Sequence, residues 1–262
     1  MPDPVRTSEN EEHWREFLTR GDSMMHVGRR VFTHLPSDPR CRLCTAPFSG
    51  FGGSLMRVIG KKPSSANPNV CTSCANALIR HHGGAEVEGS MLFADIRGST
   101  TLAENMSPAE FHALLDRFYR VASRTVFDHD GAIDKFVGDE LVAMFYVGLS
   151  GERHVARAID AARALLRATG HLDTGGPWVG VGAGVHTGKV WFGAVGDASH
   201  IELTAVGDAV NTTARLAAAA SAGEVLVSVE AAQAAGLDPT FQRRQLELKG
   251  KRLPVEVVTL SA

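Results

Sequence analysis

Four cysteines in two Cys-x-x-Cys pairs place the strongest constraint on how the first third of this 262-residue chain can fold. The pairs are Cys41/Cys44 and Cys71/Cys74, and no cysteine is left over. A two-residue spacer lets both sulfurs of a pair face one ion, so four thiolates can surround Zn²⁺. Redox dithiols and iron–sulfur clusters use similar pairs. We expect a structural zinc site, because the loop-rich segment around these cysteines is too short to bury a core unaided.

The sequence pattern divides the chain into four parts. Residues 1–40 are expected to form a helical segment, 41–80 the four-cysteine module and 81–90 a linker. From 91 to 262, short apolar strands alternate with amphipathic helices, which predicts an α+β domain. Two adjacent histidines in the linker are more typical of an exposed linker than of a metal site, since four cysteines complete a zinc shell.

Composition limits the functions open to the chain. Hydrophobic residues make up 44% and charged residues 21%, an ordinary balance for a folded protein. The formal net charge of −2 provides no global positive field for nucleic acid or an anionic membrane, which disfavours a zinc-ribbon nucleic-acid binder. No uncharged apolar run reaches the roughly 18 residues of a membrane span. The N-terminus is too acidic and polar for a signal peptide, so we expect a cytoplasmic protein without membrane insertion.

Two aspartates follow predicted strands at positions that suit a metal-bound phosphate. Asp95 leaves the strand 91–94, and Asp139 lies in a tight turn within 132–145, although aspartate is also a common turn former. A strand–helix–strand crossover would make these strands neighbours, so that both carboxylates meet at one pair of ions. N–H groups for phosphate oxygens are expected from the turn after Asp95, at Gly98, Ser99 and Thr100.

A predicted helix after Gly207 carries Asn211 and Arg215 four positions apart, and therefore on one face. A guanidinium can neutralise a phosphoryl group in a transition state, and an amide can orient one of its oxygens. The alternative is a solvated helix face. Nearer the C-terminus, Lys249 lies on a turn between two predicted strands, where a basic side chain is usually only solvated.

Taken in order, these motifs resemble the catalytic domain of class III nucleotide cyclases from about Met91 to Leu260. Phe93-Ala-Asp-Ile-Arg-Gly-Ser-Thr100 is similar to the first metal motif, and Lys135-Phe-Val-Gly-Asp-Glu140 to the second. Thr204 to Arg215 resembles the transition-state helix, and Leu248-Lys-Gly-Lys251 the phosphate-binding turn. The resemblance implies a ferredoxin-like βαββαβ core with extra C-terminal strands, preceded here by a small zinc-ribbon-like module.

The resemblance also implies a role for each group. Two Mg²⁺ or Mn²⁺ ions would be held by Asp95, Asp139 and the backbone carbonyl of Ile96, and the ribose 3′-hydroxyl would attack the α-phosphate as pyrophosphate leaves. The amide–guanidinium pair would stabilise the transition state, and Lys249 would hold the triphosphate. In this family the metal aspartates come from one subunit, and the base-reading and transition-state residues come from the other. Because one chain here carries both sets, a homodimer with two equivalent sites is expected.

Base choice falls to Lys135 and Thr204 on the same resemblance. A lysine donor and a hydroxyl favour adenine, whereas guanine would want a carboxylate in place of the lysine. We therefore expect an adenylate cyclase; the alternatives are a guanylate cyclase and an inactive cyclase-like module that senses metal or redox state. Thr204 stands where the best-known members carry aspartate. His200 and Glu202 stand where many relatives carry arginine and aspartate, which predicts that an extra phosphate-binding arginine is missing.

Overall fold

One mixed sheet of eight strands organises the structure, a computed structural model that describes residues 4–35, 38–247 and 254–262. The strands lie in the order β2-β3-β1-β4-β6-β8-β7, with β5 also paired to β4. Paired strands are antiparallel except β4 and β6. The strands are β1 (Gly83–Ile96), β2 (Ala132–Val137), β3 (Glu140–Phe145), β4 (Val181–Gly196), β5 (Ile201–Val206), β6 (Val225–Ser228), β7 (Arg243–Leu246) and β8 (Val255–Leu260).

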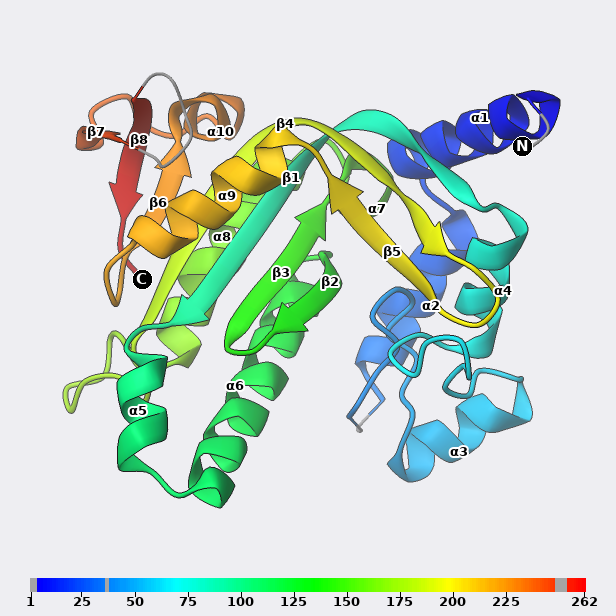
Figure 1. Cartoon of the computed structure of the whole chain (residues 1–262), viewed down its shortest axis with the longest axis horizontal. Coiled ribbons are helices and arrows are strands. Elements are labelled where there is room, and N and C mark those ends of the chain that lie inside the picture. Colours follow the sequence, from blue (N-terminus) through cyan, green and yellow to red (C-terminus); the bar gives the residue numbers. More distant parts are fainter. Residues whose placement is uncertain (1–3, 36–37, 248–253) are drawn as a thin grey trace.

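Helices cover both faces of the sheet (Figure 1). α6 (Pro108–Asp128), α8 (His154–Ala168) and α10 (Val229–Ala234) pack on one face, and α9 (Asp208–Ala219) packs on the other. The succession β1-α6-β2-β3-α8-β4, with β2-β3-β1-β4 as spatial order, confirms the expected ferredoxin-like core and α+β class. No helix in the described ranges is long and apolar enough to cross a membrane. The shorter helices and those near the N-terminus are α1 (Pro4–Arg20), α2 (Ser23–Thr33), α3 (Gly50–Val58), α4 (Thr72–Arg80), α5 (Ser99–Asn105) and α7 (Val147–Ser150).

Local sequence signals match the structure at two elements that matter for the site. The Ser107 hydroxyl accepts a hydrogen bond from the Glu110 N–H, and the Glu110 carboxylate accepts one from the Ser107 N–H, so a capping box begins α6. β2 and β3 form the predicted hairpin, and Gly138 in its turn has φ 60°, a left-handed conformation that favours glycine.

The glycines of β4 allow α9 to lie directly against the sheet. A Cβ built on Gly184 would lie 2.4 Å from the backbone nitrogen of Ala217, and one on Gly182 would lie 2.8 Å from the carbonyl oxygen of Ala220. The alternation of glycine with valine and alanine in this strand predicted a close neighbour on the glycine face, and that neighbour is α9.

β1 begins earlier than the sequence pattern indicated. The expected linker contributes residues 83–90 to this strand, which pairs with β4 along its whole length. Ala85 and Val87 are buried and alternate with exposed Glu86 and Glu88, the period of a half-buried strand. Glycines on either side of this short alternation concealed it. In Figure 1 the ribbon of β1 and β4 continues beyond the central sheet to the N-terminal helices.

The N-terminal helices and the cysteine segment share one apolar core with the sheet. The Trp14 indole N–H donates to the carbonyl of His81 at 2.6 Å and so fixes α1 beside the start of β1. Burying apolar groups from both parts together removes them from water in one continuous cluster. Members of this cluster include Trp14, Leu18, Cys41, Cys44, Cys71, Cys74, Leu78, Val87, Met91, Tyr146, Phe192 and Ile201.

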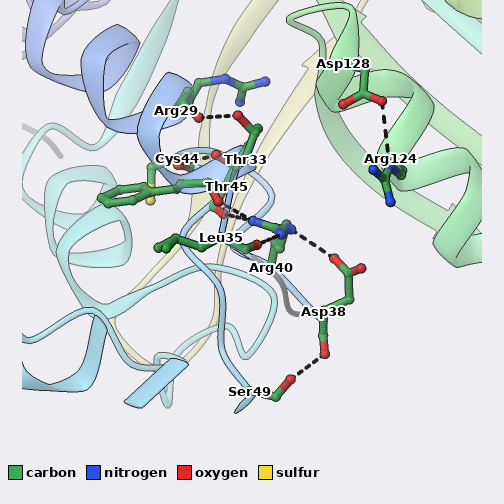
Figure 2. A network of polar contacts seen from close by, with 11 residues as sticks. Arg29, Thr33, Leu35, Asp38, Arg40, Cys44, Thr45, Ser49, Arg124 and Asp128 are labelled. Atoms are coloured by element: carbon green, nitrogen blue, oxygen red, sulfur yellow. Dashed lines mark hydrogen bonds and ion pairs between the residues drawn. The ribbon is translucent and has the colours of Figure 1, made fainter. Parts of the chain in front are cut away.

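Two arginines fasten the first cysteine pair to its surroundings. Arg29 of α2 is 3% exposed and donates to the carbonyl of Leu43, and at 2.7 Å to the carbonyl of Gly131 just before β2. Arg40 donates to the carbonyls of Leu35 and Thr45 and pairs with Asp38, as Figure 2 shows. The first pair is therefore linked both to α2 and to the start of β2.

Replacing Arg29 with alanine is expected to lower the free energy of unfolding by about 3 kcal/mol, because two buried carbonyls lose their donor and each such loss costs about 1–3 kcal/mol. Urea denaturation measures the change. Arg30→Ala is the matched control, since Arg30 is exposed on the same helix; its effect should stay below about 0.5 kcal/mol. Equal stability of the two variants would contradict the bridging role of Arg29.

Candidate active site and cysteine cluster

The end of β1 lies beside the turn between β2 and β3, which brings the two predicted metal-binding aspartates close together. In the antiparallel register Asp95 is opposite Glu140, and Asp139 directly precedes Glu140 in the turn. Cross-strand and sequential Cα spacings therefore place Asp95 and Asp139 within about 10 Å of each other. Ile96, whose carbonyl is the third predicted ligand, is buried.

The three predicted phosphate-contacting residues begin α5. Gly98 has φ 70° and ψ 24°, and this left-handed conformation turns the chain from β1 into the helix. Ser99 and Thr100 form the first helical turn, where N–H groups have no intrahelical acceptor. The structure thus places these N–H groups directly after the Asp95 end of β1.

Excess negative charge gathers at this end of the sheet. Arg97 forms an ion pair with Asp95. Burial, and then the neighbouring Asp139, raise the pKa of Glu140, whereas Arg97 lowers it. Asp95, Asp139 and Glu140 thus lie around one guanidinium, and carboxylate and carbonyl oxygens are the ligands that Mg²⁺ prefers. The donor set fits divalent cations.

Arg97 is a residue whose placement the sequence reading missed. Its guanidinium also donates to the carbonyls of Ala218 and Ala220, at 3.1 and 3.2 Å, and so links the end of β1 to the C-terminal end of α9. A helix C-terminus carries partial negative charge, which favours a cation there. An arginine inside the first metal motif could have drawn attention to this position. Its contact with α9 could not be predicted, because that helix lies more than a hundred positions away in the sequence.

The hairpin turn is fastened to α6. The Tyr119 hydroxyl donates to the carbonyl of Gly138, and the Tyr119 ring stacks on Phe136 with centroids 4.1 Å apart. Tyr119 therefore holds the turn that carries Asp139 in two ways, by a hydrogen bond to the turn's backbone and by a ring contact with Phe136 just before the turn.

The two residues expected to select the base are in contact within one chain. Lys135 Nζ lies 3.4 Å from Thr204 Oγ1, which itself donates to Asp134 Oδ2 at 2.9 Å. Lys135 Nζ also lies 3.5 Å from Asp134 Oδ1 and 3.6 Å from Glu202 Oε2. The lysine and the hydroxyl, 69 positions apart in sequence, thus form one polar cluster with two carboxylates.

Asp134 is the member of this cluster that sequence reasoning missed. Its side chain is 4% exposed, and burial raises its pKa while the charge of Lys135 opposes the rise. Consecutive side chains of a regular strand point to opposite faces, so a strand pattern alone would direct Asp134 away from Lys135. A register shift between Ile133 and Lys135 leaves Asp134 without a partner on β3, and this β-bulge lets both side chains reach Thr204.

α9, which packs against β4 and β1, carries the predicted amide–guanidinium pair. Asn211 is exposed and Arg215 is half-buried. Among the residues that the structure describes, neither side chain makes a hydrogen bond or ion pair, and none joins them to Asp95 or Lys135. Lys249, predicted to hold the triphosphate, lies outside the described residues.

The four cysteines come together as a buried cluster. Their sulfur atoms all lie within 4.8 Å of one another, and Cys44 Sγ is 3.7 Å from Cys71 Sγ. No disulfide joins them. Hydrogen bonds from its neighbours lower the pKa of Cys71, whereas burial raises that of Cys41. This geometry and chemistry fit a tetrahedral metal, and Arg29 lies near enough for its charge to offset that of the thiolates.

The chain belongs to the adenylate and guanylate cyclase catalytic domain family, whose model matches residues 85–261. Its relatives include an adenylate cyclase from Anabaena cylindrica, 34% identical over 131 residues, which are 48% of this chain and 26% of that protein. Adenylate cyclase 1 of Rhizobium meliloti is 35% identical over 144 residues, 52% of this chain and 22% of that protein. The chain thus covers about a quarter of these relatives.

Solved structures of both substrate types resemble the fold. The guanylyl cyclase Cya2 superposes with a TM-score of 0.62 at 26% identity, over 68% of this chain and 93% of that one. The adenylyl cyclase CyaB from P. aeruginosa gives 0.59 at 25% identity, over 68% of this chain and 96% of that one. The comparisons establish membership of the cyclase catalytic-domain family and leave the choice of base to the residues themselves.

Proposed function

We propose that this chain is an adenylate cyclase that converts ATP to 3′,5′-cyclic AMP and pyrophosphate. The observation that carries the proposal is the polar cluster in which Lys135 and Asp134 of β2 meet Thr204 of β5. Because the resemblance assigns the metal-binding groups to one subunit and the base-reading groups to the other, this cluster would read the base of a triphosphate held by Asp95 and Asp139 of a second copy.

The hydrogen-bond directions within the cluster favour adenine. An ionised carboxylate only accepts, so the Thr204 hydroxyl directs its proton to Asp134 and keeps its lone pairs for donors. Lys135 supplies one donor, and the adenine amino group is a suitable second one, while Lys135 can also donate to adenine N1. Guanine presents O6 and N1–H at the same edge and would meet the opposite pattern.

Asp95, Asp139 and the carbonyl of Ile96 would hold two Mg²⁺ or Mn²⁺ ions. Bound there, such ions lower the pKa of the ribose 3′-hydroxyl and offset triphosphate charge. The N–H groups of the turn at 98–100 bind phosphate oxygens. Asn211 orients an oxygen of the pentavalent α-phosphate while Arg215 balances its charge, and Lys249 holds the leaving pyrophosphate.

The lack of side-chain partners for Asn211 and Arg215 among the described residues supports a homodimer with two equivalent sites. Asn211 and Arg215 make no side-chain hydrogen bond or ion pair with any described residue, so they are available to a substrate held by the metal-binding groups of a second copy. Val137 and Val206, beside the metal turn and the base-reading strand, are 55% and 56% exposed, which suits burial against another subunit.

Purified protein incubated with Mn²⁺ and either ATP or GTP should form mainly cyclic AMP, as chromatography of the products would show. Asp95→Asn should lower the rate at least about 100-fold, because one metal carboxylate is lost while the fold is kept. Asp116→Asn, on the exposed surface of α6, is the control. Cyclic GMP as the main product would make the chain a guanylate cyclase. No product from either nucleotide would favour the inactive metal or redox sensor.

Mixing an Asp95→Ala chain with an Arg215→Ala chain should restore activity that neither has alone. With random pairing about half of the dimers are mixed and each has one intact site, so about a quarter of wild-type activity is expected. Differently tagged chains allow the mixed dimer to be isolated and assayed. An isolated mixed dimer without activity would refute sites shared between subunits.

We further propose that the four cysteines hold one structural Zn²⁺ per chain. Elemental analysis should find it, and Cys71→Ser should lower both zinc content and the free energy of unfolding, the latter by at least about 3 kcal/mol, because metal binding contributes to folding. Ser73→Ala, an exposed neighbour in α4, is the control. If the protein contains iron instead and absorbs visible light, the four cysteines hold an iron–sulfur cluster and not zinc. A metal-free, stable protein would overturn the metal site.

A further inference from the structure

We propose that Arg42, between the two cysteines of the first pair, is a positioning residue for base recognition. It would act by holding the bulge of β2 that directs Asp134 and Lys135 toward Thr204. This inference rests on the proposed adenylate cyclase function and deepens it, since it assigns part of the base-reading geometry to the cysteine module.

The bulge needs support from outside the sheet. Among the described residues, β2 is an edge strand that pairs with β3 alone, and Asp134 has no partner in that pairing. Such a position leaves backbone groups to be satisfied by other parts of the structure. Arg42 Nη1 donates to the carbonyl oxygen of Asp134 at 3.1 Å, so a group from the cysteine module completes the bulge.

Charge and ring contacts add to this hydrogen bond. Burial lowers the pKa of Arg42, while the carboxylates of Asp134 and Glu202 raise it, so the guanidinium lies near both acidic members of the polar cluster. Its carbon Cζ also lies 5.8 Å from the centroid of the Phe136 ring. Arg42 thus contacts β2 on both sides of Lys135 in sequence.

The contact with Phe136 continues to the metal-binding turn. The Phe136 ring stacks in turn on the Tyr119 ring. The Tyr119 hydroxyl donates to the carbonyl of Gly138, one residue before Asp139. A packed chain of side chains therefore runs from Arg42 through Phe136 and Tyr119 to the turn. Both predicted substrate-contacting residues of this hairpin, Lys135 and Asp139, lie on backbone that this chain restrains.

The cysteine module also holds the strand that carries Thr204. The Asn67 side-chain amide donates to the carbonyl of Ile201 at 2.9 Å, and the Ile201 N–H donates to the carbonyl of Ala66 at 3.3 Å. The same loop accepts at Asn69 from the Arg42 backbone N–H at 3.0 Å. Arg42 is therefore fixed at its backbone to the loop that holds β5 and at its side chain to β2.

This arrangement sets the spacing between Lys135 and Thr204 from outside the sheet. Loss of the guanidinium frees the Asp134 carbonyl and lets the bulge relax, which moves Lys135 relative to Thr204. Small displacements of positioned groups cost large factors in reactions that depend on them. Discrimination between adenine and guanine should therefore fall more than the rate of the chemical step. The residues proposed for that step, Asp95, Asp139, Asn211 and Arg215, are unchanged.

The test uses Arg42→Met in the full chain, because methionine keeps much of the apolar stem and removes the donors. We expect KM for ATP to rise and the ATP/GTP ratio of kcat/KM to fall about tenfold, with kcat at saturating ATP changed less than about threefold. Hydrogen exchange of the β2 amides should become faster, while metal content stays unchanged. Arg42→Lys, which can still donate one hydrogen bond to Asp134, should restore part of the ratio.

Arg80→Ala is the matched control, because it removes an exposed arginine from the same module. Binding of 3′-deoxy-ATP and 3′-deoxy-GTP, which lack the attacking hydroxyl, separates recognition from turnover. Suppose that wild-type protein prefers ATP and forms cyclic AMP. If Arg42→Met then keeps both the KM for ATP and the ATP/GTP ratio of kcat/KM, this inference alone fails. If wild-type protein forms no cyclic nucleotide and binds neither analogue, the proposed function fails instead. If kcat falls and the ratio stays, Arg42 is merely structural.

Discussion

The pairing of β1 with β4 is the interaction on which the rest of the structure depends. The two strands stay in antiparallel register from Gly83 and Ala194 to Ile96 and Val181. One end of this ribbon delivers Asp95 to the β2–β3 turn, and the other end supports α1 and the cysteine segment. Because this strand pair is continuous, it links two regions that the sequence pattern separates.

At two of the three proposed sites, the charges in the chain leave room for what a ligand would bring. The carboxylates at the end of β1 exceed the one arginine that contacts them, a state that divalent cations would relieve. Asn211 and Arg215 on α9 have no charged partner among the described residues, a state that a phosphate would relieve. The polar cluster at Thr204 is different, since its hydrogen bonds are largely satisfied inside the chain. Such a cluster is suited to a fixed pattern of donors and acceptors, which a base requires more than a phosphate does.

The sequence predicted those parts of the fold that depend on local periodicity or on a recognisable motif. The capped helix α6, the β2–β3 hairpin, the close approach on the glycine face of β4 and the meeting of the four cysteines all follow from residues near one another in sequence or from paired spacing. The early start of β1 was missed because glycines interrupt its alternation. Asp134, Arg97 and Arg42 could not be placed, since a bulge changes which face a side chain takes and the partners lie far away in the chain.

The position of the cysteine cluster suggests why a chain with a large sheet core would keep one. β2 and β5 are strands with an unpaired edge, and such edges are prone to slip or to pair with other chains. The cysteine module covers both, through Arg42 on β2 and the loop at residues 66–69 on β5. A loop without regular structure could not hold two edges at a fixed distance by apolar packing alone, because short loops bury too little surface. A metal held by the four cysteines, as proposed above, would provide the needed rigidity, so it would stabilise a spacing as well as a fold, and that spacing is the one between Lys135 and Thr204.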